Sequence, residues 1–495
     1  MQKLVIINES DNVAVALKDI EGGEEFPALE LKAFDAVPCG HKIALCDIKK
    51  GGDVIKYGYP IGRAETDIAK GRHIHIHNIK TNLEGILDYR YNPVPQPDKK
   101  AADDRCFMGY LRKNGEAGVR NEVWVIPTVG CINRAAERIA AIANEKFADK
   151  TDGVFAFLHP YGCSQMGGDS ILTQKTLAGL ANNPNAAGVL ILGLGCENNQ
   201  IENFKPFLGG YDPDRVKFLV MQEAGDEIKE SLKLIFQLAA YAHSFKRQNL
   251  PAGKLKIGLK CGGSDGFSGI TANPLAGRFS DRLTDCGGTA ILTEVPEMFG
   301  AETILMNRCR DLGVFDKTVS LVNDFKNYYV RCGQTIYENP SPGNKHGGIS
   351  TLEEKSLGCI QKGGTGKVVA VLDYGQKASI SGLNLLNGPG NDIVANTSLA
   401  ASGAQLILFT TGRGTPLGGP VPTVKISSNS DLYNKKPHWI DFDAGTLSED
   451  ISMNTKQLDD AFFDYVLAVA SGETRTKNEI NGYREIAIFK DGVTL

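Results

Sequence analysis

Residues 71–78 read Gly-Arg-His-Ile-His-Ile-His-Asn, so three of the eight histidines of the chain stand at alternate positions. Alternation is typical of a β-strand, whose successive side chains point to opposite faces. We therefore predict a strand with His73, His75 and His77 on one face and the two isoleucines packed on the other. Imidazole is the commonest protein ligand of first-row transition metals and exchanges protons near neutral pH. This strand is the first candidate for chemistry.

The geometry of a strand limits what these three histidines can do together. At a rise of about 3.3 Å per residue, the first and third would lie about 13 Å apart at Cα. Two neighbours can share one ion, whereas three need a twist or bulge, so we expect two ligands and one proton donor or acceptor. His41, in Gly40-His41-Lys42, is a further candidate acid or base. The alternative is a polar strand face that happens to use histidine.

Length and composition exclude several classes of protein. At 495 residues the chain exceeds the size of a single core, and 42% hydrophobic residues with 56 glycines indicate a glycine-rich globular protein. A net charge of −4 offers no basic surface for nucleic acid. No apolar run approaches the ~20 residues that span a membrane, and no signal peptide is recognisable. Eleven cysteines without a Cys-x-x-Cys pair indicate a reducing, cytoplasmic compartment.

The pattern of predicted strands, turns and helices changes along the chain. Residues 1–92 alternate short β-like runs with glycine and aspartate turns, which predicts a small all-β module. Residues 93–105 form a proline-rich linker. Beyond it, β-runs, glycine-rich turns and helices alternate, which predicts α/β domains at 106–250 and 251–495 with mostly parallel sheets.

Four of these predicted strands end on a turn that carries cysteine beside glycine. The cysteines are Cys131, Cys163, Cys196 and Cys261. Parallel sheets gather ligands at the carboxyl edge of their strands. Two interpretations stay open: the four bind one metal or iron–sulphur cluster if their turns meet, or they pack as small apolar residues. Glu294 and Glu297, three apart around a proline, are either active-site carboxylates or caps at a helix start.

Two further turns, at 339–345 and 410–416, combine backbone amides with hydroxyls and one cation each. Such loops suit a carboxylate or phosphate, which arginine grips through two parallel hydrogen bonds. The residues that we expect to bind substrate are Lys42, Asn344, Arg413, Thr415, Ser264 and Asp265, with Lys345 beside them. The run at 363–367 lacks the spacing of a phosphate loop, so no nucleotide is expected.

Taken together, these strings resemble the altronate and galactarate dehydratase family, from end to end of the chain. The matching segments are Gly40-His41-Lys42, Lys56-Tyr57-Gly58, the histidine strand, Tyr161-Gly162-Cys163, Gly195-Cys196-Glu197, Cys261-Gly262-Gly263-Ser264-Asp265, Pro340-Ser341-Pro342-Gly343-Asn344-Lys345 and Thr411-Gly412-Arg413-Gly414-Thr415-Pro416. The resemblance implies a module similar to the SAF or β-clip type, followed by a large α/β catalytic region.

The resemblance also implies an activity in sugar-acid catabolism. Members remove water from a sugar acid to give a 2-keto-3-deoxy acid; for D-altronate the product is 2-dehydro-3-deoxy-D-gluconate. Iron(II) or manganese(II) is associated with this activity. The alternatives are another hexonate or hexarate such as galactarate, a C–S lyase of the sulfolactate sulfo-lyase type, or a sugar-acid-binding scaffold without turnover. At this size we also expect a homo-oligomer.

Such a dehydration removes a weakly acidic proton from C2 and expels hydroxide from C3. We expect two of the three strand histidines to hold the ion and His41 or the remaining histidine to act as base or acid. The predicted catalytic residues are thus His41, His73 and Lys345. Arg413 and Lys345 would hold the carboxylate and the polyol chain.

Overall fold

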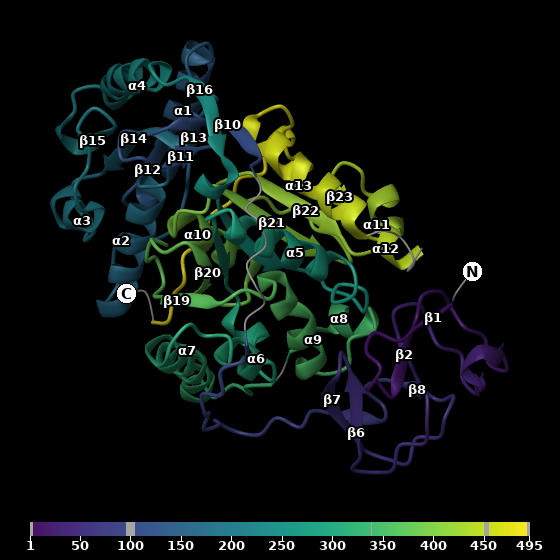
Figure 1. The fold of residues 1–495 in the computed structure, drawn as a ribbon. Coiled ribbons are helices and arrows are strands. Elements are labelled where there is room, and N and C mark those ends of the chain that lie inside the picture. Colours follow the sequence, from purple (N-terminus) through teal and green to yellow (C-terminus); the bar gives the residue numbers. More distant parts are fainter. Residues whose placement is uncertain (1–2, 96–103, 338, 450–454, 493–495) are drawn as a thin grey trace.

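The computed structural model describes residues 3–95, 104–337, 339–449 and 455–492. A small β module stands at one end of the molecule and the sheet of the second domain at the other, with the largest sheet between them (Figure 1). Residues 96–103 of the expected proline-rich linker lie outside the described residues. The predicted fold class, a small β module followed by an α/β region with parallel sheets, is confirmed.

The N-terminal module is built from short antiparallel strands. One sheet has the order β1 (Leu4–Val5), β2 (Val13–Ala16), β5 (Lys42–Ala44), β8 (His73–Ile74). A second has the order β6 (Asp53–Lys56), β7 (Tyr59–Ala64), β9 (Ile79–Lys80), and β3 (Glu25–Phe26) pairs with β4 (Leu31–Lys32). The module has a small core of its own around Leu4, Ile20 and Ile43.

The other half of the module packs on the C-terminal domain. Ile74 and Ile79 are buried in the same continuous hydrophobic cluster as Leu352 and Leu357 of helix α9 (Leu352–Cys359). Burial of shared apolar surface fixes the two units against each other. The histidine segment is therefore held at the boundary between module and catalytic region.

The second domain carries a parallel sheet whose order is β13 (Val154–Ala156), β12 (Glu122–Pro127), β14 (Ala186–Gly193), β15 (Val216–Val220). Every residue of β14 is buried, as expected for a parallel strand covered on both faces. Helices α1 (Asn133–Phe147) and α4 (Glu227–His243) cover one face. Helices α2 (Gly167–Ala181) and α3 (Ile201–Leu208) cover the other, together with α10 (Asp392–Ala401) of the C-terminal domain.

A small antiparallel sheet precedes the C-terminal domain. Its order is β11 (Ala117–Gly118), β10 (Cys106–Leu111), β16 (Arg247–Pro251). The sequence pattern suggests a domain boundary near residue 250. In the structure this segment is strand β16, which pairs with β10, the first strand after the predicted linker.

The C-terminal domain has a seven-stranded parallel sheet. Its order is β19 (Val368–Leu372), β20 (Gly382–Leu386), β18 (Thr289–Leu292), β17 (Lys256–Cys261), β21 (Leu406–Thr411), β22 (Thr423–Ser427), β23 (Phe442–Asp443). Its other helices are α5 (Ala272–Asp285), α6 (Glu302–Met306), α7 (Leu312–Arg331), α8 (Pro342–His346), α11 (Ser430–Lys435), α12 (Thr446–Glu449), α13 (Thr455–Ser471) and α14 (Lys477–Ile480).

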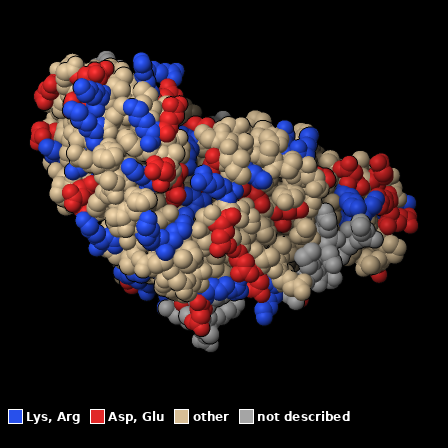
Figure 2. All heavy atoms as spheres, turned by 90° about the horizontal axis from the view of Figure 1, so that it is seen from above, with Lys and Arg blue, Asp and Glu red and all other residues tan. Residues whose placement is uncertain are grey.

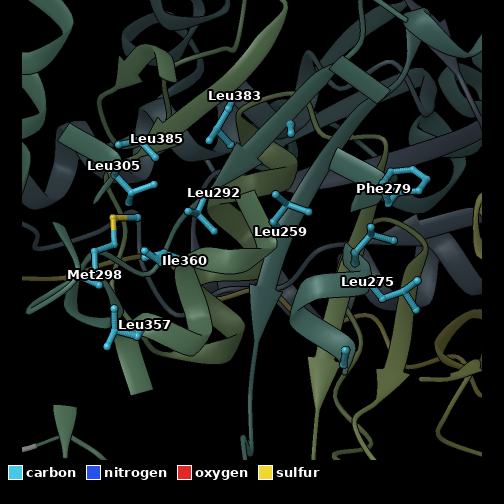
Figure 3. Packing of buried hydrophobic residues seen from close by; sticks show 14 of the residues in the cluster. Leu259, Leu275, Phe279, Leu292, Met298, Leu305, Leu357, Ile360, Leu383 and Leu385 are labelled. Carbon is cyan, nitrogen blue, oxygen red and sulfur yellow. The ribbon is translucent and has the colours of Figure 1, made fainter. Parts of the chain in front are cut away.

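Leucine side chains fill the centre of this domain. Leu259 and Leu292 project from neighbouring strands towards Leu275 and Phe279 of α5 on one side and Met298 on the other (Figure 3). This packing holds the carboxyl ends of the strands, and the turns that follow them, in fixed positions.

Neither positive nor negative charge dominates the face of the molecule seen from above (Figure 2). Lysine and arginine alternate with aspartate and glutamate over that face (Figure 2), in keeping with the small net charge of −4. Among the described residues, none of the helices combines the length and the apolar character that a bilayer crossing requires.

Candidate active site

The histidine segment is not one continuous strand, so that prediction is wrong. Strand β8 ends at Ile74, and the chain turns through residues 75–78 before β9. Asn78 stabilises the turn: its Nδ2 donates to the His73 carbonyl (2.9 Å) and its Oδ1 accepts from the His75 amide (3.0 Å). Ile74 is buried as predicted, but Ile76 is 50% exposed, because the turn carries it away from the core.

The turn gathers the imidazoles that an extended strand would separate. The ring centroid of His73 lies 5.8 Å from that of His75 and 5.2 Å from that of His77. His41 joins them, since β5 pairs antiparallel with β8: its Nδ1 is 3.0 Å from His73 Nε2, and its ring centroid is 4.7 Å from that of His75. Four imidazoles therefore form one group, hereafter the histidine cluster (His41, His73, His75, His77).

Burial keeps three of these imidazoles, those of His41, His73 and His75, neutral near pH 7. Desolvation, reinforced by neighbouring imidazoles and by Lys42, lowers the pKa of His73 to about 4. Desolvation and then the Lys42 cation lower the pKa of His75 to about 3. Burial also lowers the pKa of His41. Each ring thus retains a nitrogen lone pair that can accept a proton or bind a metal ion.

Loops of the C-terminal domain complete the cluster. His41 Nε2 lies 3.4 Å from the His346 carbonyl oxygen, and His75 Nδ1 is 3.0 Å from Ser350 Oγ. His346 Nδ1 in turn is 3.0 Å from Arg413 Nη1. The sequence had given no sign of His346 or Ser350, because a single histidine or serine in a loop has no informative spacing.

Lys42 has a structural role that corrects its prediction as a substrate ligand. Its Nζ is buried and donates to both carboxylate oxygens of Glu354 (3.0 and 2.9 Å) and to the Gly348 carbonyl (2.8 Å). An ammonium group has three protons, so all of its donors are used within the protein. Lys56, equally buried, bonds the same Glu354 at 2.8 Å. Although burial opposes ionisation, the two lysines lower the pKa of Glu354 to about 2.

A pocket of about 700 Å³ lies between the module and the C-terminal domain, and it is lined by Gly40 and Gly347, the chain neighbours of His41 and His346. Its walls include Asp19, Cys39 and Gly40 from the module and Asp265, Arg413 and Asn429 from the other side. Arg413 is exposed. Asp265 is buried, which raises its pKa, and it accepts hydrogen bonds from Ser268, Ser428 and Asn429.

The other residues that we expected to bind substrate differ in whether their side chains are used within the protein. Asn344 caps α8, accepting from Ser341 and donating to the Ser264 carbonyl at 2.8 Å, so its amide serves the loop rather than a ligand. Lys345 is half-buried on α8, next to His346, and Thr415 is half-buried after β21. Of the predicted set, Arg413 and Asp265 line the pocket.

Cys261 lies in a different group from the other turn cysteines, so the structure does not support the interpretation in which all four bind one metal or cluster. Its Sγ is 3.3 Å from Cys359 Sγ, and both thiols donate to Glu297 Oε2 (3.0 and 3.1 Å). Among the described residues, these three form the only set of His, Cys, Asp or Glu whose ligand atoms all lie within 4.8 Å of one another. The sequence had indicated Glu297 but not Cys359.

Three buried lysines surround this Cys–Glu–Cys group. Lys362 Nζ lies 2.7 Å from Cys261 Sγ, and Lys355 pairs with Glu297 at 2.7 Å. Lys260 pairs with Glu294 at 2.5 Å. Burial opposes ionisation of Glu297, but the lysines outweigh it and lower its pKa. Glu294 makes no capping bond to the short helix η5 (Val295–Glu297), so the capping interpretation fails for it.

Comparison with known proteins identifies the class. The chain belongs to the D-galactarate/altronate dehydratase family: residues 252–494 match the C-terminal domain, 109–243 the second domain and 2–82 the SAF domain of that family. The family that the motifs indicated is confirmed, and with it the class of hydro-lyase enzymes.

Relatives with assigned names match along the whole chain. It is 50% identical over 503 residues to altronate dehydratase of Bacillus subtilis (strain 168), covering 100% of both chains. It is 53% identical over 493 residues to altronate dehydratase of Escherichia coli (strain K12), covering 99% of both. Galactarate dehydratase (L-threo-forming) of the same strain is 31% identical over 505 residues, covering 98% of this chain and 96% of its own.

The first prediction concerns Glu354. Replacing it by glutamine (E354Q) leaves Lys42 and Lys56 buried without a counter-charge, which costs about 3–5 kcal/mol of unfolding free energy. Urea unfolding measures the loss. The control is E65Q, which breaks an exposed pair with Lys80 and costs under about 1 kcal/mol. Equal stability of the two variants would contradict the role of Glu354.

The second prediction is the pH dependence of the same carboxylate. Its pKa falls from 4.5 in the unfolded chain to about 2 in the folded protein, so its stabilising effect is complete above pH 4.5 and is lost as pH falls towards 2. The stability difference between the parent and E354Q should therefore shrink by about 2 kcal/mol between pH 6 and pH 3. A constant difference over this range, measured by urea unfolding, would show that Glu354 titrates normally.

Proposed function

We propose that this protein dehydrates D-altronate to 2-dehydro-3-deoxy-D-gluconate and water with the help of a divalent metal ion. The observation that carries the proposal is the histidine cluster, which is connected through His346 to Arg413, and Arg413 lines the pocket. Substrate choice is supported by 50–53% identity to two altronate dehydratases, against 31% for the galactarate enzyme.

The histidine cluster fits a divalent ion such as Fe²⁺ or Mn²⁺. The lowered pKa values of His41, His73 and His75 leave their ring nitrogens unprotonated, and imidazole suits both metals. We propose that two of His73, His75 and His77 hold the ion. When bound there, the ion would withdraw electron density from the substrate carboxylate and C2 hydroxyl, which makes the C2 proton easier to remove.

The side chains around the pocket supply binding and proton transfer. Arg413 lines the pocket, and a guanidinium group can bind the substrate carboxylate through two hydrogen bonds. Lys345, on the adjacent helix α8, would bind the polyol chain. His41 is neutral, and its Nε2 faces the His346 carbonyl oxygen, so its lone pair is on Nδ1, which faces His73 Nε2. We propose that Nδ1 exchanges this contact for the C2 proton of the substrate.

The Cys261–Glu297–Cys359 group is a second candidate for the ion, favoured by the convergence of its three ligand atoms. Thiolates suit softer metals such as Zn²⁺ or Fe²⁺ better than Mn²⁺. Binding of Mn²⁺ therefore favours the histidine cluster over the Cys–Glu–Cys group as the site of the ion.

The decisive experiment is an anaerobic assay of metal-stripped protein with added Mn²⁺ or Fe²⁺ over a panel of hexonates and hexarates. We expect the keto-deoxy product from D-altronate and less than about one-tenth of the activity without metal. Two of the three variants H73A, H75A and H77A should lower bound Mn²⁺ at least about tenfold, whereas C261S should not. Full turnover after chelation, or Mn²⁺ loss only in C261S, contradicts the proposal. Preference for galactarate, release of sulfite from sulfolactate, or binding without turnover would select the alternatives.

A further prediction concerns Arg413. R413A should raise KM for altronate about 10–100-fold, because a bidentate charge-assisted contact contributes roughly 1.5–3 kcal/mol, and R413K should recover only part of this. Metal content should stay unchanged. R134A serves as the control, since Arg134 is 89% exposed on α1 of the second domain. A normal KM in R413A would exclude carboxylate binding by this residue.

We also propose unit bounds of 1–92, 106–250 and 251–495, with a linker at 93–105. The supporting observations are the change of sheet type along the chain and the three family matches. Cysteine usage supports a cytoplasmic, reducing environment, and chain length supports a homo-oligomer.

A further inference from the structure

Three Gly-Cys pairs stand at the carboxyl edge of the sheet in the second domain. Cys131 follows β12, within the short helix η2 (Gly130–Ile132), Cys163 follows β13, and Cys196 follows β14. These strands are adjacent and parallel, with β12 in the middle. We propose that Cys131, Cys163 and Cys196 hold an iron–sulphur cluster, at a site separate from that of the divalent ion.

Hydrogen bonds join the three turns into one surface. The Gly130 amide donates to the Tyr161 carbonyl at 2.8 Å, which joins the first turn to the second. The Asn199 amide donates to the Gly162 carbonyl at 3.0 Å, and the Ser164 amide to Asn198 Oδ1 at 2.8 Å, which join the second turn to the third. The cysteines are therefore carried by a single rigid edge rather than by independent loops.

The backbone of this edge is held in a conformation that costs energy. Ser164, directly after Cys163, has a φ of +56°, in the left-handed region that a serine rarely adopts. Gly162 has a φ of +103°, and a Cβ at that position would lie 2.0 Å from the Thr128 carbonyl oxygen. Strain of this kind persists where the surrounding structure enforces it, and it is concentrated at functional sites.

The thiols themselves face solvent. All three cysteines are exposed and free. The neighbouring Glu197, in contrast, is turned inwards, where it accepts from Thr128 Oγ1 at 2.5 Å and from the Gly195 amide at 2.6 Å. Gln222 Nε2 donates to Cys196 Sγ at 3.7 Å, a type of contact that stabilises cluster thiolates. The edge thus offers thiols to a ligand while its carboxylate is used internally.

Each turn also contains a buried polar atom without a hydrogen-bond partner among the described residues. These atoms are Asn133 Oδ1, Gln165 Nε2 and Asn199 Oδ1, two or three residues beyond each cysteine. Asn199 is only 1% exposed. Buried polar groups are nearly always paired, so these three atoms are available to a group bound at this edge.

The three thiols are too far apart to share a single metal ion. With a metal–sulphur length of about 2.3 Å, a tetrahedral ion needs its sulphurs about 3.8 Å apart. The three sulphurs do not form a set within 4.8 Å of one another, whereas Cys261, Glu297 and Cys359 do. A cluster places several irons and sulfides between its thiolates and so accommodates wider spacing. With three cysteine ligands, a four-iron cluster keeps one iron open to water or a substrate oxygen.

The test is anaerobic purification and reconstitution of the full chain with Fe²⁺ and sulfide. We expect about four irons and four acid-labile sulfides per chain, broad visible absorption and a paramagnetic signal after reduction. C131S, C163S and C196S should each lower bound sulfide at least about fivefold. C46S and C332S replace exposed cysteines elsewhere and should leave it unchanged.

A second readout does not depend on variants. In reconstituted protein the three cysteines should be protected from alkylation, as measured by mass spectrometry, while Cys46 and Cys332 react. Iron without sulfide in the parent, an unprotected edge, or a full cluster in the triple serine variant would overturn the proposal. Altronate turnover of Mn²⁺-loaded protein is measured in parallel, so failure of the cluster and failure of the proposed function are distinguished.

Discussion

The buried ion group of Lys42, Glu354 and Lys56 is the interaction on which the site depends. The two lysines come from strands of the N-terminal module, and the glutamate comes from α9 of the C-terminal domain, about 300 residues further along the chain. Burying charges costs several kcal/mol per ion unless their geometry is well matched. The geometry at Glu354 is well matched, because its carboxylate accepts hydrogen bonds from both lysines and from the Ser350 amide at 2.8 Å. The module is therefore held against α9 in one defined position.

The position of the module on α9 determines both where the histidine cluster lies and how its imidazoles are protonated. His41 precedes Lys42, and Ser350, which contacts His75, lies four residues before Glu354. The Lys42 cation contributes, after burial, to the lowered pKa of His41, His73 and His75. A single buried contact thus docks the module and also helps to keep the imidazoles neutral, as ligands and bases must be.

Local patterns predicted most of the fold and part of the site. The β-runs at 123–128, 154–159 and 255–260 each contain a strand. Strands can be predicted here because a short run of apolar and β-branched residues is a local signal that needs no knowledge of distant contacts. Histidine alternation correctly indicated a group of imidazoles, but the strand ends at Ile74 because Asn78 bonds back to the chain, which alternation cannot reveal. Glu354, His346 and Cys359 could not be found, since their partners are distant in sequence. Lys42 was misassigned for the same reason: its counter-ion lies on α9.

The two candidate centres for a divalent ion differ in the protons that binding would displace. At the Cys–Glu–Cys group, Lys260, Lys355 and Lys362 face Glu294, Glu297 and Asp392, so the charges of these side chains already balance. Contact with Cys261, followed by burial, raises the pKa of Cys359, so an ion there must displace the thiol proton of Cys359. His41, His73 and His75 have no such cost, because their lowered pKa values leave them neutral at pH 7. Ion binding at the histidines should therefore depend little on pH near neutrality, whereas binding at the thiols should release protons, and this difference is why we assign the ion to the imidazoles.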